Sequence, residues 1–217
     1  MTLWRRTVCD SPLSWRRRFY EHMSDAFRCQ LRASVHRATR TPMDVATCLD
    51  LRGRLGWVAF AHDLQHHIHR VWLPDTVYCP TPYQALLWSA ADIIMWTNDL
   101  VSYTREAASA ETSNLALALQ AELGLTPQQT VDEVHRMIAE KVQDFLKAGR
   151  ELPGLVRSLG LSDDVRLVAE QCLAHLRTLV RGTHDWHVSC ERYRPGGDGA
   201  ADRHGFDDLF GVAHDVR

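Results

Sequence analysis

Closely spaced cysteines are missing from this chain: it has six cysteines among 217 residues, but no Cys-x-x-Cys pair. Zinc ribbons and disulfide-rich folds depend on such spacing, so the sequence favours neither. A secretory leader and an apolar run long enough to cross a membrane are missing as well. The sequence therefore predicts a cytoplasmic protein with no membrane association. Its cysteines are expected to be reduced structural residues, namely Cys9, Cys29, Cys48, Cys79, Cys172 and Cys190.

The chain also has little net charge. The formal charge is -2 at pH 7 and 45% of the residues are hydrophobic, which is the composition of an ordinary soluble domain. Arginine is concentrated in residues 1–54, which hold eleven Arg against five Asp or Glu, and a nucleic-acid-binding arm is one interpretation. Because these arginines are spread through an amphipathic helix, we interpret them as a solvated face with a few phosphate binders. We expect no nucleic-acid partner.

Alternating β-branched residues, the pattern of half-buried strands, occur nowhere, whereas helix patterns dominate. Apolar residues recur at every fourth position of one segment, at Trp15, Phe19, Met23, Phe27, Leu31 and Val35. A chain of this length is long enough to bury a sizeable core. The sequence therefore predicts an all-α fold, with one helical domain over residues 1–194 and a Gly- and Asp-rich tail over residues 195–217.

Threonine followed by proline predicts helix starts, because threonine is an N-cap residue and proline lacks the N–H that the first turn leaves unpaired. Such pairs begin at Thr41, Thr81 and Thr126. A glutamine three residues later completes a capping box in two of them, at Gln84 and Gln129. Helix ends are predicted where glycine can adopt the left-handed conformation, at Gly124, Gly149 and Gly160.

Three oxygen-bearing side chains share one face of a predicted helix. Asn98, Ser102 and Glu106 are four residues apart, and a helix turns ~100° per residue, so they lie one above another. Hard oxygen ligands suit Mg²⁺ completed by a phosphate-bearing substrate, and Arg105 lies within reach of the same phosphate. A hydrogen-bonded or solvated helix face is the other interpretation. The apolar run at 86–96 indicates a buried helix, but spacing alone leaves both open.

This pattern resembles a motif of a known family. Asn-Asp-Leu-x-Ser-x-x-x-Glu, with a basic residue before the Glu, is similar to the second metal-binding motif of class I terpene synthases. Two further matches follow the order of that family: a pyrophosphate-sensing arginine with its linker and effector upstream, and a tryptophan followed by an Arg-Tyr pair downstream, as in bacterial members. The matching residues are Arg52, Leu55, Gly56, Trp186, Arg192 and Tyr193. The similarity extends from about Leu3 to Tyr193.

The resemblance implies the C-terminal two-thirds of a class I terpenoid synthase helical bundle, from a Mg²⁺-dependent terpene synthase or cyclase. A chain truncated in this way is expected to be weakly active or inactive. Such an enzyme ionises a prenyl diphosphate, here expected to be farnesyl diphosphate, releases pyrophosphate and cyclises the carbocation. A homodimer is the assembly that the family favours. By the same resemblance, Mg²⁺ would be bound by Asn98, Ser102 and Glu106. Pyrophosphate would be contacted by Arg52, Arg105, Arg192 and Tyr193, and the cavity would include Gly56 and Trp186.

Neighbouring polar residues are left out of the predicted site. Asp99 follows Asn98, so its side chain points ~100° away from the metal face, and we expect it to be a helix or salt-bridge partner. His62, His66 and His69 share a helix face, which makes zinc an alternative, but no matching Cys, Asp or Glu set accompanies them. We expect them to be solvated. A di-iron bundle is excluded because no Glu-x-x-His pair occurs.

The aspartate-rich motif that the family carries on an earlier helix would precede Met1. Asp207 and Asp208 in the tail resemble it as a string, but they follow the Arg-Tyr pair in a Gly-rich segment, so we do not assign them the metal role. Without the early helices, part of the apolar stripe at 15–35 is expected to be exposed, which predicts poor solubility, self-association or a partner that supplies the missing wall. The alternative to an enzyme is a non-catalytic helical relic or a phosphate-binding module.

Overall fold

The computed structural model describes residues 3–190 and 193, and within these ranges the chain forms helices and no strand. The predicted all-α class is confirmed. The predicted tail at 195–217 lies outside the described residues. The helices are α1 (Leu3–Val8), α2 (Leu13–Thr39), α3 (Val45–Leu55), α4 (Val58–His69), α5 (Asp75–Tyr78), α6 (Thr81–Ala108), α7 (Leu115–Leu123), α8 (Pro127–Ser158) and α9 (Asp163–Ser189).

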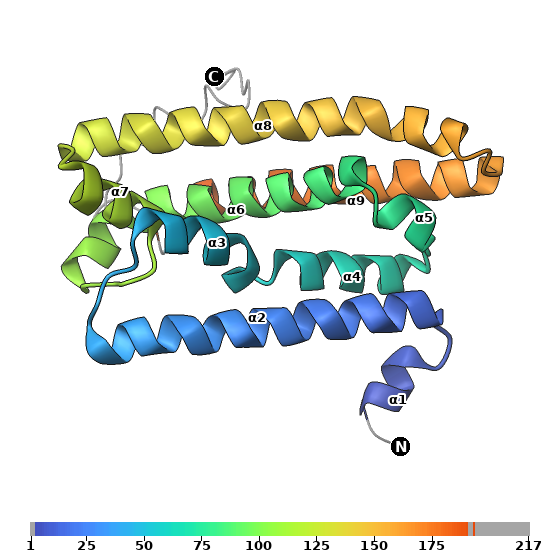
Figure 1. Cartoon of the computed structure of the whole chain (residues 1–217), viewed down its shortest axis with the longest axis horizontal. Coiled ribbons are helices and arrows are strands. Elements are labelled where there is room, and N and C mark those ends of the chain that lie inside the picture. Colours follow the sequence, from blue (N-terminus) through green and yellow to red (C-terminus); the bar gives the residue numbers. More distant parts are fainter. Residues whose placement is uncertain (1–2, 191–192, 194–217) are drawn as a thin grey trace.

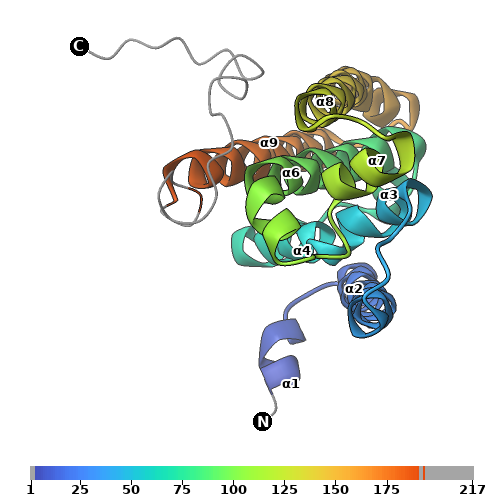
Figure 2. The ribbon, with the colours of Figure 1, turned by 90° about the vertical axis from the view of Figure 1, so that its left-hand side faces the viewer.

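Helix α6 lies at the centre of the bundle. It packs most extensively on α8 and then on α9, and it also contacts α3, α4 and α7, while α2 lies against the outer side of α3 and α4 (Figures 1 and 2). Side chains on several sides of α6 are therefore buried, as is typical of a helix that others surround. The most completely buried large ones are Tyr83, Leu86, Leu87, Ile93 and Leu100.

The start of α8 follows the predicted capping signal. Thr126 is the N-cap, and its hydroxyl accepts the backbone N–H of Gln129 at 3.3 Å while the Gln129 side chain accepts the Thr126 N–H at 2.9 Å. Gly124 ends α7 with a φ of 63°, and Gly160 follows α8 with a φ of 61°. The capping box and these two left-handed glycines are confirmed.

Two other predicted boundaries were wrong. α3 begins after Asp44 rather than Thr41, because the Asp44 carboxylate accepts the Thr47 N–H at 2.7 Å and is the stronger N-cap acceptor. α8 continues through Gly149 to Ser158, because a single glycine inside a helix costs only about 1 kcal/mol relative to alanine. A Cβ there would be in ordinary van der Waals contact with Leu173 of α9, at 3.5 Å, so the packing does not require glycine.

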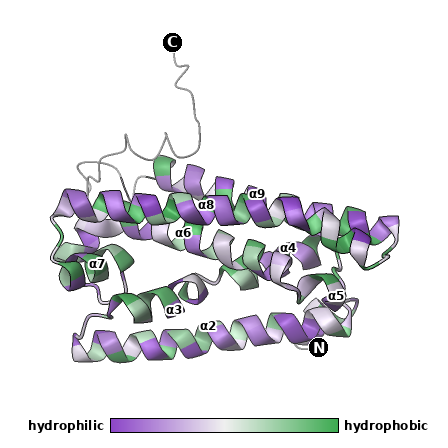
Figure 3. Cartoon of the chain, turned by 45° about the horizontal axis from the view of Figure 1, so that its top comes forward, coloured by the Kyte–Doolittle hydropathy of each residue, from purple (hydrophilic) through white to green (hydrophobic). Residues whose placement is uncertain are grey.

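Part of the predicted apolar stripe on α2 is uncovered. Trp15 and Phe19 are buried against α4 and its neighbours, whereas Phe27, Leu31 and Val35 are 55%, 69% and 61% exposed. Figure 3 shows apolar and polar segments alternating along this helix. Partial exposure of the stripe was expected. No helix in the described part of the chain is long and apolar enough to span a membrane.

A break separates α3 from α4 and faces α6. Gly56 caps α3 with a φ of -79°, and the left-handed residue is the next one, Trp57, with a φ of 58°. The predicted break at Gly56 is therefore confirmed. A Cβ added to Gly56 would lie 2.0 Å from Sδ of Met95 on α6, so only glycine allows this approach without displacing the methionine.

Replacing Gly56 with alanine is expected to destabilise the fold by about 1 kcal/mol, the low end of overpacking costs, because the new methyl group displaces the flexible side chain of Met95. Adding Met95→Ala to the same chain should recover part of the loss. Gly182→Ala in α9 is the control: nothing lies within 4 Å of its added Cβ, so helix propensity should stabilise it by up to ~1 kcal/mol. Urea denaturation measures all three, and a Gly56→Ala chain as stable as the parent would contradict the close approach.

Candidate functional site

The three predicted metal ligands lie along the last turns of α6. Ser102 is fully buried, and the side chain of Glu106 is 16% exposed. The Ser102 hydroxyl donates to the backbone carbonyl of Asn98 at 2.6 Å, which leaves its oxygen lone pairs available as an acceptor. The face is therefore not a solvated helix surface, because its middle residue has no access to water in the folded chain.

The amide of Asn98 is held in one orientation by three side chains. Its Oδ1 accepts from Arg52 Nη2 at 3.2 Å, and its Nδ2 donates to the Tyr193 hydroxyl at 3.0 Å and to His187 Nε2 at 3.2 Å. Burial lowers the pKa of His187 to about 4, so the imidazole is neutral at neutral pH and accepts from the amide. The oxygen that a cation would need therefore faces Arg52.

Arg52 reaches from α3 to α6 and forms a buried ion pair with Asp99. Its Nε donates to the two Asp99 oxygens at 2.8 and 2.9 Å, and its Nη2 donates to Oδ1 as well. Asp99 is fully buried and also accepts the backbone N–H of Leu115 at 3.0 Å. Burial acts to lower the pKa of Arg52, but the charge of Asp99 and its hydrogen bonds outweigh burial and raise it. Asp99 is the salt-bridge partner that its position predicted.

The other end of the face carries the two charged residues of the motif. Arg105 Nη2 contacts Glu106 Oε1 at 3.2 Å, and the Arg105 guanidinium lies 5.3 Å from the centre of the Tyr193 ring, within the range of a cation–π attraction. Trp186 meets the same ring edge-to-face at 5.6 Å and is 48% exposed. One tyrosine therefore links the end of α9 to both ends of the α6 face.

Most of the predicted site residues lie together in the structure. The contacts above join Arg52, Asn98, Ser102, Arg105, Glu106, Trp186 and Tyr193. Gly56, at the α3–α4 break one turn after Arg52, faces Met95 of α6, and none of these contacts joins it to the cluster. Arg192 and the tail residues Asp207 and Asp208 lie outside the described residues.

Two residues of the cluster were missed. His187 contacts Asn98, and Asn114 contacts Glu106 from the start of α7, with Nδ2 at 2.9 Å from Oε2. An asparagine before an apolar run is a recognisable N-cap signal. Spacing within the sequence says nothing about which carboxylate such a cap faces, because that depends on how α7 packs on α6.

The donor set fits a hard divalent cation in type, since it offers an amide oxygen, a hydroxyl and a carboxylate on one face. Its charge balance is incomplete, because Glu106 is the single anion among the three ligands. A cation bound by Asn98 Oδ1 would lie beside the Arg52 guanidinium, which now occupies that oxygen at 3.2 Å. Two cationic groups this close repel, so such a site requires a further anion between them.

A second polar cluster lies between α4 and α6. His62 and His66 are fully buried, and the Tyr83 hydroxyl lies 2.7 Å from Nε2 of His62 and 3.4 Å from Nε2 of His66. The expectation that these histidines are solvated was wrong, because the α4 face that carries them packs against α6; His69 is exposed. Among the described residues, no group of three or more His, Cys, Asp or Glu side chains is arranged to hold a metal ion.

The buried histidines predict a loss of stability in acid. Burial lowers the pKa of His62 to about 3, whereas an unfolded chain has a histidine pKa of about 6.5. The unfolded chain therefore binds a proton that the folded chain excludes, and stability present above pH ~6.5 is lost as the pH falls toward ~3. This group alone should remove roughly 2 kcal/mol by pH ~5. Urea midpoints across this range test it, and a pH dependence unchanged by His62→Gln would contradict it.

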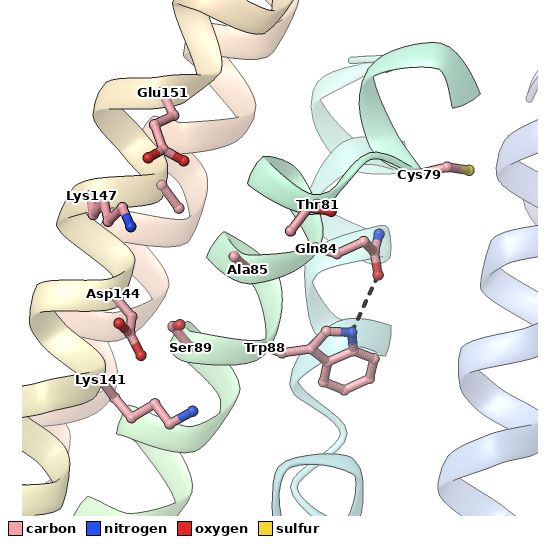
Figure 4. A pocket seen from close by; sticks show the side chains of 11 residues that line it. Cys79, Thr81, Gln84, Ala85, Trp88, Ser89, Lys141, Asp144, Lys147 and Glu151 are labelled. Atoms are coloured by element: carbon pink, nitrogen blue, oxygen red, sulfur yellow. Dashed lines mark hydrogen bonds between the residues drawn. The ribbon is translucent and has the colours of Figure 1, made fainter.

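A groove of about 500 Å³ between α6 and α8 holds none of the predicted site residues. Lysine and carboxylate side chains alternate along its α8 wall (Figure 4). On the α6 wall, Gln84 accepts the indole N–H of Trp88 at 3.2 Å and donates to the Tyr78 carbonyl, instead of forming the predicted capping box. Lys141 is paired with Asp92 at 3.2 Å. The mixed charge of the groove makes it a poor binding site for pyrophosphate.

Comparison with known proteins gives matches over most of the chain. The family described as "Terpene synthase family 2, C-terminal metal binding" matches residues 1–144. The (-)-delta-cadinene synthase of Streptomyces clavuligerus is 33% identical over 186 residues, which cover 86% of this chain and 57% of that protein. Pentalenene synthase of Streptomyces avermitilis is 28% identical over 193 residues, with 88% and 57% covered. The chain thus spans little more than half the length of these relatives.

Solved structures share the arrangement of helices. The linalool/nerolidol synthase from Streptomyces clavuligerus, in complex with 2-fluorogeranyl diphosphate, superposes with a TM-score of 0.78 at 24% identity, covering 85% of this chain and 62% of that one. An α-eudesmol synthase gives a TM-score of 0.80 at 20% identity, covering 86% and 60%. These likenesses show the class I terpenoid synthase helical fold.

Proposed function

The chain belongs to the terpene synthase family, and on that premise we propose that it is the metal-binding part of a Mg²⁺-dependent enzyme that ionises a prenyl diphosphate. The supporting observation is the contact between Asn98 Oδ1 and Arg52 at 3.2 Å. A cation held by that oxygen needs an anion to separate it from the guanidinium. A pyrophosphate group, with oxygens for both the metal and the arginine, meets this need.

The residues of the face divide between the cation and the anion. Asn98, Ser102 and Glu106 are the proposed metal ligands. Arg52, Arg105 and Tyr193 are the proposed contacts to pyrophosphate. Tyr193 contacts both ends of the face. Asp99 accepts hydrogen bonds from Arg52 Nε, so the guanidinium is charged and oriented before a substrate binds. When bound, Mg²⁺ supplies Lewis-acid stabilisation of the negative charge that develops on the leaving group.

The wall beside the anion site is aromatic. Trp186 packs edge-to-face against Tyr193, whose ring also lies near the Arg105 guanidinium, and aromatic faces attract cations. We assign Trp186 to the wall that the allylic carbocation would meet. Arg192, which precedes Tyr193 in the chain, is assigned to the pyrophosphate by its motif alone.

The proposed substrate is farnesyl diphosphate, followed by cyclisation to a terpene. One relative supports this choice: the (+)-T-muurolol synthase of Roseiflexus castenholzii, described as farnesyl diphosphate cyclizing, is 27% identical over 191 residues. This chain spans 57% of that protein. That the chain is active by itself is therefore also a proposal.

Product analysis tests this function. The purified chain is incubated with geranyl, farnesyl and geranylgeranyl diphosphates in Mg²⁺, and volatile products are separated and identified. We expect terpene products from farnesyl diphosphate that disappear when EDTA replaces Mg²⁺. Pyrophosphate release that is independent of metal, or no binding of Mg²⁺ with pyrophosphate at all, would contradict the proposal.

A further inference from the structure

Asn114, at the start of α7, is buried and fully hydrogen bonded. Its side chain is 1% exposed, and Oδ1 accepts the backbone N–H of Leu117 at 3.1 Å as the N-cap of α7. Nδ2 donates to the Asp99 carbonyl and to Glu106 Oε2, each at 2.9 Å. Because the oxygen faces a donor and the nitrogen faces two acceptors, the amide has one orientation.

The start of α7 thus supports both halves of the proposed site. The next residue, Leu115, donates its backbone N–H to the Asp99 carboxylate that holds Arg52. Glu106 lies only two residues before the end of α6, where helices fray. Its carboxylate contacts Arg105 through Oε1 and Asn114 through Oε2. Of these two partners, Asn114 is the one anchored in a second helix.

We propose that Asn114 is a positioning residue for Glu106: it holds Oε2, so that the carboxylate stays aligned with Asn98 and Ser102 on the cation-binding face. This inference rests on the function proposed for that face. A carboxylate that must bind a cation loses affinity when it can rotate away, and removing the hydrogen-bond partners of metal ligands typically costs 10- to 100-fold in affinity or activity.

The variant Asn114→Ser separates this role from helix capping. Serine is also a good N-cap residue, so the bond to Leu117 is retained, whereas the amide that reaches Glu106 is gone. Asp44→Ser is the matched control, because Asp44 caps α3 by accepting the Thr47 N–H at 2.7 Å. The same type of cap is changed there without touching the proposed site.

The first measurement needs no metal. Urea midpoints are compared for Asn114→Ser, Glu106→Ala and the double variant. If the two side chains act as a pair, the double variant should lose less than the sum of the single losses. Asp44→Ser combined with Glu106→Ala should be additive. Additive losses for the Asn114 pair would overturn the coupling.

The second measurement is binding of Mn²⁺ in the presence of pyrophosphate, followed by electron paramagnetic resonance. We expect about tenfold weaker Mn²⁺ binding for Asn114→Ser and an unchanged affinity for Asp44→Ser. Unchanged affinity in Asn114→Ser, with binding lost in Glu106→Ala, would overturn the role of Asn114 and leave the proposed function intact. Equal binding by the parent chain and Glu106→Ala would overturn both.

Discussion

Replacing Asp99 with alanine is expected to destabilise the fold by about 3–5 kcal/mol, because it leaves the Arg52 guanidinium buried without its counter-charge. Asp99 is fully buried and the Arg52 side chain is 11% exposed, so water cannot take over the lost contacts. The Leu115 N–H loses its acceptor as well. Urea denaturation followed by circular dichroism at about 222 nm measures the loss as a shift of the unfolding midpoint.

Two control variants show whether this loss is specific to the buried ion pair. Asp50→Ala removes a carboxylate that is 50% exposed and ion-paired with Arg32 and Arg54, and it should cost no more than about 1 kcal/mol. Arg52→Met combined with Asp99→Leu removes both buried charges and should recover part of the loss. If Asp99→Ala costs no more than Asp50→Ala, the ion pair does not hold α3 on α6.

Replacing Glu106 with glutamine is expected to reduce turnover of farnesyl diphosphate by about 100-fold or more. The change removes the single anionic ligand of the proposed cation, and several kcal/mol of leaving-group stabilisation depend on that cation. Glutamine has nearly the same size and keeps an oxygen that can accept from Asn114, so the urea midpoint should change little. Steady-state product formation at saturating Mg²⁺ measures the effect.

Asp92→Asn is the matched control for this variant. Asp92 lies on the same helix, its side chain is 17% exposed against 16% for Glu106, and it is paired with Lys141 on α8. Neutralising it changes the charge of α6 equally, but at a distance from the proposed ligands. Turnover that falls equally in both variants would show a general effect of charge on α6 rather than loss of a ligand.

The parts of the site that lie on one helix were predictable from the sequence. Asn98, Ser102 and Glu106 share a face because α-helical geometry fixes neighbours at i+4 and i+8, whatever the rest of the fold does. The capping box at Thr126 was equally local, since it depends on a few adjacent residues. Gly56 also marked the α3–α4 break correctly, although its own φ of -79° is ordinary and the left-handed residue is Trp57.

Contacts between helices were not predictable in the same way. The sequence excluded Asp99 from the metal face, but only the crossing of α3 over α6 pairs it with Arg52, 47 residues earlier. His62 and His66 looked solvated because their pattern does not reveal which face of α4 meets Tyr83. Asn114 carried a capping signal, yet its second partner depends on the packing of α7 against α6.

The most direct test of the proposed cation site is a crystal structure with Mn²⁺ and pyrophosphate, in which anomalous scattering locates the metal. We predict a peak roughly 2.0–2.3 Å from Asn98 Oδ1, Ser102 Oγ and a Glu106 carboxylate oxygen, with pyrophosphate between the metal and Arg52. A metal bound by none of these three side chains, or a pyrophosphate that lies away from Arg52, would contradict it.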